Sequence, residues 1–295
     1  MAGNLNESLP HLEEIWGLQE QAFAGFSSAD WQHRHGKDWV FADLPYHLDY
    51  FDGEVARAIS RGNDAAPEGR SVQRTMAELD AWNAEKFRER PAGQTPEQSV
   101  AGLKGTRDAI RQALAGKDDT VLSQPAWFPL VGFGAASVGT LLEGCVAHNW
   151  SEYHQLLVRA GRSGPRPSSA LTHAALNTYM HFLSAFVKPQ RARGKEFTAT
   201  MAFTGEGGGS WTFHVAGGKC TVDESDSARP DIVMTQAPET FVKTMNKMQN
   251  PMVAMLTRKI RVRGFTKMPT FGKLFAEPGK NDPIEPGSIV AAMKS

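Results

Sequence analysis

Two histidines and a glutamate crowd one stretch, AHNWSEYHQLLVRAG at residues 147–161, which otherwise has the pattern of a helix. His148 and Glu152 are four residues apart, so on a helix they lie one turn apart on the same face and can reach a single ion. His154 is six residues from His148 and points elsewhere. Such pairs also occur on solvated helix faces and as satisfied polar groups in cores, so spacing alone leaves the metal and the structural interpretation open.

A third donor comes from a helix far upstream. His47 stands among apolar residues in PYHLDYFDGEVARAIS, where an imidazole without a partner would be costly to bury. With His148 and Glu152 it forms a set of two histidines and one carboxylate, which leaves coordination positions open as catalytic zinc sites do. Iron, nickel and manganese accept the same donors. The sequence therefore predicts a divalent-metal site, with zinc as the first candidate, at His47, His148 and Glu152.

These residues need helices to position them, and the first 162 residues carry helical patterns throughout. Apolar residues recur at three- and four-residue spacing, and Gly161 is typical of a helix end. We find no convincing strand pattern before residue 162, so residues 1–162 are predicted to form an all-α bundle. The predicted helices lie at 8–27, 43–60, 71–91, 95–116 and 134–161.

The pattern changes after residue 162, where Gly, Pro and Ser predict a linker at residues 163–168. One more helix follows, and then EFTATMAFTG and GSWTFHVAGGKCTV alternate in steps of two around GEGGG, which predicts a hairpin. Further strands are predicted at ARPDIVMTQ and RKIRVRGF, with Met-rich helices between them. Residues 169–295 therefore have the pattern of an α+β domain with an antiparallel sheet.

The segments GKDWVFADLPYHLDYFD, LDAWNAEKFRER, TPEQSVAGLKGTRDAIRQAL and LLEGCVAHNWSEYHQLL resemble the DinB-like metalloenzyme family in order and spacing. The resemblance implies a four-helix bundle that holds a divalent metal, usually zinc or nickel, by a histidine of the second long helix and an HxxxH-type pair of the last. His47 and His148 fall on the first two ligand positions, whereas Glu152 stands where most members have histidine. The thiol-dependent maleylpyruvate isomerase branch also has one glutamate among its three ligands, so the resemblance keeps Glu152 as the third.

The run from TATMAFTGEGGGSWTFHV through PDIVMT to KIRVRGF, within residues 169–279, resembles the sterol carrier protein type 2 domain. The resemblance implies a five-stranded sheet covered by helices, with an apolar tunnel for lipids or other hydrophobic molecules. Flexible Met side chains suit such a cavity, although core packing is the simpler alternative for each one. The candidate ligand-binding methionines are Met245, Met248, Met252, Met255 and Met268.

The strand RKIRVRG carries Arg261 and Arg263 on one side and apolar residues on the other. A solvated strand face is the plain interpretation. Alternatively, the two arginines face the acidic bundle, or one of them holds a substrate carboxylate at the metal site. The resemblance to the maleylpyruvate isomerase branch implies an arginine from the second domain without identifying which one.

Charge excludes some classes of partner. Lys plus Arg total 32, as do Asp plus Glu, so no basic excess favours nucleic acid. Residues 1–165 carry 15 basic and 22 acidic side chains, a net charge of minus seven, and residues 166–295 carry 17 and 10, a net charge of plus seven. Two halves of opposite sign should attract each other.

The remaining features indicate a protein of the cytoplasm. No apolar stretch approaches the length of about 20 residues that a spanning helix needs, so we expect no membrane insertion. Two cysteines are no disulfide framework, and the first residues do not have the pattern of a signal peptide. A homodimer is compatible with the sequence.

Three functions are compatible with these patterns. The first is a metal-dependent thiol transferase or isomerase, in which the ion activates a low-molecular-weight thiol and the second domain holds a hydrophobic or electrophilic ligand or closes the active site. The second is a carrier of lipid-like ligands whose helical bundle is structural, and the third is an interaction protein without chemistry. Because His47 has no other evident reason to lie on an apolar helix face, we favour the enzyme.

Overall fold

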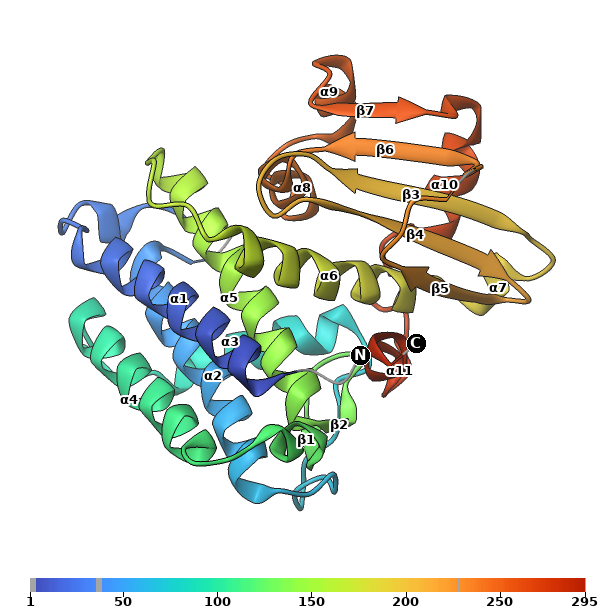
Figure 1. The fold of residues 1–295 in the computed structure, drawn as a ribbon. Helices are drawn as coiled ribbons and strands as arrows, with labels where there is room; N and C mark the ends of the chain where they lie inside the picture. Colours follow the sequence, from blue (N-terminus) through green and yellow to red (C-terminus); the bar gives the residue numbers. More distant parts are fainter. Residues whose placement is uncertain (1–3, 36–38, 228, 295) are drawn as a thin grey trace. The chain divides into compact units, whose positions relative to one another are not determined.

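The computed structural model of the chain describes residues 4–35, 39–227 and 229–294. The chain divides into two compact units, Met1–Pro167 with Lys280–Gly287, and Ser168–Gly279 with Ser288–Ser295 (Figure 1). None of the helices in the described part of the chain combines the length and the apolar character that crossing a bilayer requires.

The first unit is helical, and its helix ends carry typical capping residues. Its helices are α1 (Leu5–Ala24), α2 (Leu44–Arg61), α3 (Met76–Glu89), α4 (Pro96–Leu114) and α5 (Val138–Ala160), with 3-10 turns at Asp30–Gln32, Phe41–Asp43 and Asp119–Ser123. Ser137 caps α5 by accepting a hydrogen bond from the Thr140 amide. Gly62 and Gly161 end α2 and α5 with φ values of 63° and 62°, a left-handed conformation that favours glycine. The prediction of a helical first domain is confirmed.

A buried polar network joins the long helices of this unit. Helix α2 packs against α4 and α5, and α1 packs against α5. Arg107 on α4 is fully buried and donates hydrogen bonds to Asp52 on α2, Gln19 on α1 and Asn149 on α5. Asn149 donates to the other carboxylate oxygen of Asp52 at 3.0 Å. The guanidinium is therefore compensated inside the bundle, as a buried charge must be.

A two-stranded sheet interrupts the helical pattern before α5. Strand β1 (Pro125–Phe128) pairs antiparallel with β2 (Gly134–Ser137). The expectation of no strand before residue 162 is therefore wrong, and the last helix begins at Val138 rather than at residue 134. Both strands consist almost entirely of apolar or small residues, so they lack the alternation of polar and apolar side chains that identifies a half-buried strand.

The second unit is an α+β domain with a five-stranded sheet in the order β5-β4-β3-β6-β7. Its strands are β3 (Phe197–Phe203), β4 (Gly209–Ala216), β5 (Lys219–Asp223), β6 (Ile232–Gln236) and β7 (Ile260–Arg263). Its helices are α6 (Ser169–Ala185), α7 (Pro189–Ala192), α8 (Pro238–Met245), α9 (Pro251–Leu256), α10 (Met268–Leu274) and α11 (Ser288–Met293), with a 3-10 turn at Phe265–Lys267.

The sheet is mixed, which corrects the prediction of an antiparallel one. Strand β6 pairs parallel with β3, whereas the other neighbouring pairs of this sheet are antiparallel. Side chains alternate with the same period of two in both arrangements, so the sequence pattern did not distinguish them. The predicted β3–β4 hairpin at GEGGG is confirmed, and Gly205 and Gly207 have φ values of 95° and 71° in its turn.

Polar and apolar residues divide between the two faces of this sheet. Thr200 of β3 is paired with Thr212 of β4, and their hydroxyl groups are hydrogen-bonded at 3.0 Å on the polar face. The other face carries Trp211 and Phe213, both fully buried. The Trp211 indole donates to Asn177 of α6 at 2.9 Å, so α6 covers this apolar face.

Residues 280–287 bind to the helical unit through backbone hydrogen bonds. The Ala77 amide donates to the Lys280 carbonyl at 2.9 Å, and the Ile284 amide donates to the Arg74 carbonyl at 2.7 Å. The Ile284 side chain is buried there. The predicted second domain, residues 169–295, includes this segment, which has no periodic pattern of its own.

Candidate metal centre

The three predicted metal donors stand on two helices of the first unit. His47 lies in the first turn of α2, which starts at Leu44 and has Pro45 at a position where the missing amide of proline costs no hydrogen bond. His148 and Glu152 lie one turn apart on α5. Both His47 and Glu152 are buried, with exposed fractions of 7% and 9%.

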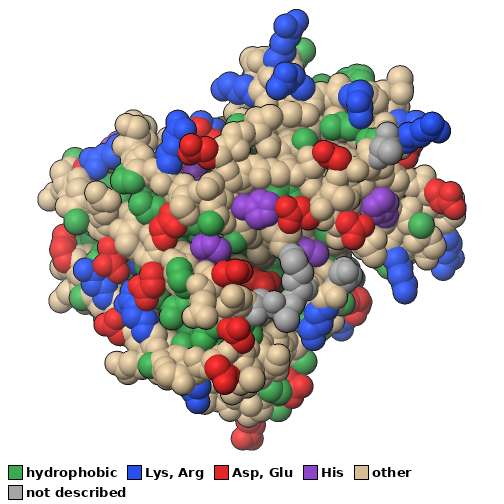
Figure 2. Space-filling view, in the orientation of Figure 1, with side chains coloured by type: hydrophobic (Ala, Val, Ile, Leu, Met, Phe, Trp, Pro, Cys, Tyr) green, Lys and Arg blue, Asp and Glu red, His purple; other side chains and the backbone are tan. Residues whose placement is uncertain are grey.

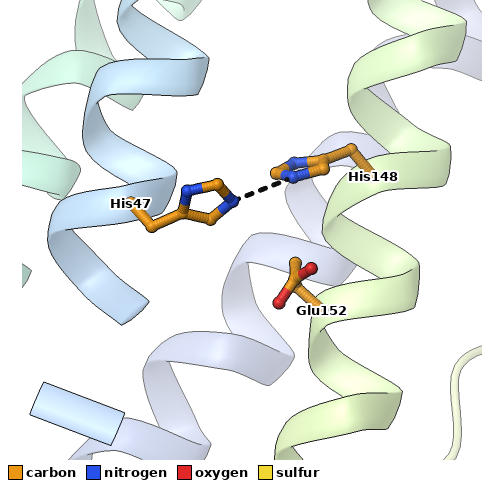
Figure 3. Close-up of side chains that lie close together, drawn as sticks. All are labelled: His47, His148 and Glu152. Atoms are coloured by element: carbon orange, nitrogen blue, oxygen red, sulfur yellow. Dashed lines mark hydrogen bonds between the residues drawn. The ribbon is translucent and has the colours of Figure 1, made fainter. Parts of the chain in front are cut away.

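The structure brings these side chains together in space. One ligand atom from each of His47, His148 and Glu152 lies within 4.8 Å of the others. The Nε2 atoms of the two histidines face each other at 3.2 Å, with the carboxylate below them (Figure 3). Two nitrogens bound to one tetrahedral zinc ion at about 2.05 Å would be about 3.3 Å apart. The donor set therefore fits a zinc-sized ion in both atom types and separation.

Hydrogen bonds fix the tautomer of His47. The Tyr50 hydroxyl donates its single proton to Asn83 Oδ1 at 2.8 Å, so in its bond with His47 Nδ1 it acts as the acceptor. His47 therefore carries its proton on Nδ1 and turns the lone pair of Nε2 towards His148. A hydrogen-bonded partner on the other ring nitrogen is typical of metal-binding histidines. Asn83, on α3, thus makes a hydrogen bond between helices.

Packing orients the His148 ring, and burial sets the protonation state of both imidazoles. The His148 ring stacks on Phe51, with centroids 3.8 Å apart and planes 20° apart. Burial lowers the pKa of His47 to about 3, and burial also lowers the pKa of His148. Both rings are therefore neutral near pH 7, the form that binds metals.

Glu152 is held by two neighbours, one of which sequence reasoning missed. His35 Nε2 lies 2.9 Å from one carboxylate oxygen, and Gln155 donates to the other at 2.8 Å. Burial opposes the charged form of Glu152, but the hydrogen bond and charge of His35 outweigh it and lower the pKa. His35 is itself only 2% exposed. It lies in an irregular segment without periodicity, so no local signal marked it.

Replacing Tyr50 by phenylalanine should weaken metal binding about 10- to 100-fold, the usual effect of losing such a partner. Without the hydroxyl, the Nδ1 proton of His47 loses its acceptor, and the ring is free to adopt the other tautomer. Competition with a chromogenic chelator measures the affinity. Tyr46→Phe removes a hydroxyl group from the tyrosine one turn before Tyr50 on α2, and it should leave the affinity unchanged. Equal affinities for Tyr50→Phe and the natural protein would contradict this role.

The free thiol of the first unit belongs to the buried polar network. Cys145 on α5 is fully buried, and its sulfur donates to Asp52 at 3.3 Å. Burial, together with the Asp52 carboxylate, raises the pKa of the Cys145 thiol well above its usual range. The aromatic residues Trp150 and Tyr153 of the same helix are core residues, because both are 0% exposed.

The predicted ligand-binding residues of the second unit are not all buried. Met245, Met248 and Met255 are half-buried, whereas Met252 on α9 is 55% exposed. Arg261 and Arg263 are exposed on β7, as the plain interpretation of that strand expects. Their binding of a ligand stays a prediction.

Comparison with known proteins adds family information. Residues 11–156 match the DinB superfamily, and residues 183–270 match the SCP-2 sterol transfer family. Structures of mycothiol-dependent maleylpyruvate isomerase and of a mutant of it align with 81% of this chain and 87% of theirs, at 11% identity and TM-scores of 0.46 and 0.49. A sec-alkylsulfatase from a Pseudomonas species aligns over 70% of this chain and 30% of its own, at 12% identity and a TM-score of 0.33. No curated protein matches the sequence.

Proposed function

The chain joins a DinB-superfamily domain to an SCP-2 sterol transfer domain, and from this premise we propose that it is a metal-dependent enzyme of the thiol-transferase or isomerase type. The observation that carries the proposal is the convergence of His47, His148 and Glu152 from two helices on one point. Two neutral nitrogens and one carboxylate balance half of the charge of a divalent ion and leave coordination positions for an exchangeable ligand.

A divalent ion in this centre supplies a Lewis acid that lowers the pKa of a bound thiol or water molecule. The protein's own residues prepare that chemistry. His47 presents an unprotonated Nε2 because Tyr50 accepts its other proton, and Glu152 is held ionised beside His35. Cys145 is buried with a raised pKa, and burial also raises the pKa of the Cys220 thiol, so we assign the reacting thiol to a separate small molecule.

A polar pocket of about 720 Å³ in the first unit offers room for the body of that molecule. Glu54 on its wall follows His47 by seven residues on α2, a distance of about 10 Å along a helix. Trp82, also on its wall, contacts the Tyr50 ring, with centroids 5.1 Å apart. The three metal donors are not among its lining residues, and we propose only that its polar wall binds a compound rich in hydrogen-bonding groups.

We propose that the second domain binds a hydrophobic ligand. Its match to the SCP-2 sterol transfer family supports this role. If the metal centre proves empty of any ion in solution, this domain carries the function, and the protein is a carrier whose bundle is structural. Either way, we expect the ligand of this domain to be small and apolar.

Elemental analysis of protein purified without a polyhistidine tag tests the proposal. We expect about one zinc, nickel or iron per chain, bound by the three donors, and its loss in His148→Ala and in Glu152→Ala. His154→Ala is the matched control, because this histidine is on the same helix but outside the donor cluster, and it should keep the ion. A natural protein that binds no metal even after incubation with zinc would overturn the enzyme proposal and favour the carrier.

A further inference from the structure

Exposed hydrophobic side chains gather in one short part of the second unit. Among the described residues, the large hydrophobic side chains that stay exposed are Met252 (55%), Val253 (50%), Leu256 (81%) and Phe265 (60%). All four fall within 14 residues of sequence, 252–265, on α9 and just beyond the end of β7. Scattered single hydrophobic residues are ordinary on a surface, but such a concentration marks an interaction site.

The same part of the chain is strongly basic. Residues 240–276 contain no Asp or Glu and eight Lys or Arg residues, at positions 243, 247, 258, 259, 261, 263, 267 and 273. Figure 2 shows Lys and Arg side chains over the α9–β7 end of the second unit. Three of the eight pair with acidic residues outside the stretch, Lys243 with Glu239, Lys247 with Glu277 and Lys267 with Asp231. The surplus of basic charge still produces a positive field, which attracts an anionic partner.

The fold displays these two kinds of side chain together. Strand β7 is an edge strand of the sheet, and α9 contacts it. Arg263 pairs with Val233 and Arg261 with Thr235, which puts both arginines on the polar face of the sheet. The exposed apolar residues of α9 precede β7 and Phe265 follows it, so apolar groups lie at both ends of the basic strand.

Two basic residues beside this surface have a strained backbone conformation. Lys247 and Arg258 are the non-glycine residues of the described chain with positive φ, at 56° and 59°. They lie on either side of α9, and Arg258 adopts a conformation for which glycine is usual after a helix. A left-handed conformation costs a non-glycine residue about 1–2 kcal/mol, and Lys247 is paired with Glu277 at 3.0 Å.

We propose that this surface, made of Met252, Val253, Leu256, Arg261, Arg263 and Phe265, docks the protein reversibly onto an anionic lipid surface. Apolar side chains would enter the boundary between head groups and acyl chains, while the basic side chains bind lipid phosphates and carboxylates. A nucleic acid would use the charges but would not require exposed apolar side chains, and an acidic protein is separated from a lipid surface by the vesicle experiment below. Docking of this kind would bring the second domain to a source of hydrophobic ligand, and it does not depend on the metal centre.

Co-sedimentation of the full-length protein with vesicles tests the proposal. We expect binding to phosphatidylcholine vesicles that contain phosphatidylserine, much weaker binding to phosphatidylcholine alone, and a decline with added salt. The pair Arg261→Gln and Arg263→Gln should lower the partition coefficient roughly 25-fold, because each basic side chain near an anionic surface contributes about fivefold. The pair Met252→Ser and Leu256→Ser should lower it about tenfold or more, through loss of buried apolar area.

A charge-matched control separates this surface from net charge. Arg193→Gln with Lys219→Gln removes two exposed basic residues from elsewhere in the second unit, Lys219 being on the opposite edge strand, and should leave binding nearly unchanged. An equal loss in this control would overturn the proposal in favour of general electrostatics. A loss in the arginine pair but none in the Met252 and Leu256 pair would overturn it in favour of a purely electrostatic contact without apolar insertion. No binding to the anionic vesicles would overturn it outright.

Discussion

Asp52→Ala should lower the free energy of unfolding of the helical unit by about 3–5 kcal/mol, the usual cost of removing one partner of a buried ion pair. The Asp52 carboxylate accepts hydrogen bonds from Arg107, Asn149 and Cys145, and both Asp52 and Arg107 are 0% exposed. Without it, the guanidinium keeps Glu20, 3.7 Å away, as its nearest remaining carboxylate. Urea unfolding followed by tryptophan fluorescence measures the change, since six of the seven Trp residues lie in this unit.

Two further variants identify the cause of that loss. Asp52→Leu with Arg107→Met removes both charges, and it should regain most of the stability because no uncompensated ion remains. Asp49→Ala removes a half-buried carboxylate from the same helix, which bonds to Thr106, and should cost only about 1 kcal/mol. If Asp52→Ala costs no more than Asp49→Ala, the network does not stabilise the bundle in the way described.

Local spacing was enough to predict which side chains approach each other on one helix. His148 and Glu152 share a face of α5, and the apolar residues around His47 were the reason to look for a partner of its imidazole. The structure brings these three side chains together, and their binding of a metal stays a prediction. The two fold classes were likewise readable from periods of 3.6 and 2 in the sequence.

Features that depend on contacts between distant segments were not predictable in this way. His35 reaches Glu152 across 117 residues, and the acceptor for Tyr50 is Asn83 on another helix. The parallel pairing of β6 with β3 follows from the path of the chain between them, which leaves no trace in the alternation of either strand. Strands β1 and β2 were missed because PAWF and GAAS are apolar or small throughout, so polar and apolar residues do not alternate in them.

Zinc added to metal-free protein should raise the free energy of unfolding of the helical unit by about 4 kcal/mol, when free zinc is about a thousandfold above its Kd. The ion would join α2 to α5 through His47 and His148, which are 101 residues apart in sequence and have no fixed separation in the unfolded chain. Binding to the folded state alone therefore becomes folding free energy. The shift of the urea midpoint, again read by tryptophan fluorescence, measures it, and a chelator should reverse it.

Glu152→Gln is the informative variant, because it keeps the size of the side chain and removes the anionic donor. We expect little or no stabilisation by zinc in this variant, while His154→Ala should respond like the natural protein. Magnesium, which prefers a shell of oxygen ligands, should stabilise neither. If Glu152→Gln gains as much stability from zinc as the natural protein, the ion binds elsewhere on the unit. The buried triad would then be a polar pairing between α2 and α5, and the case for metal chemistry at this site would fail.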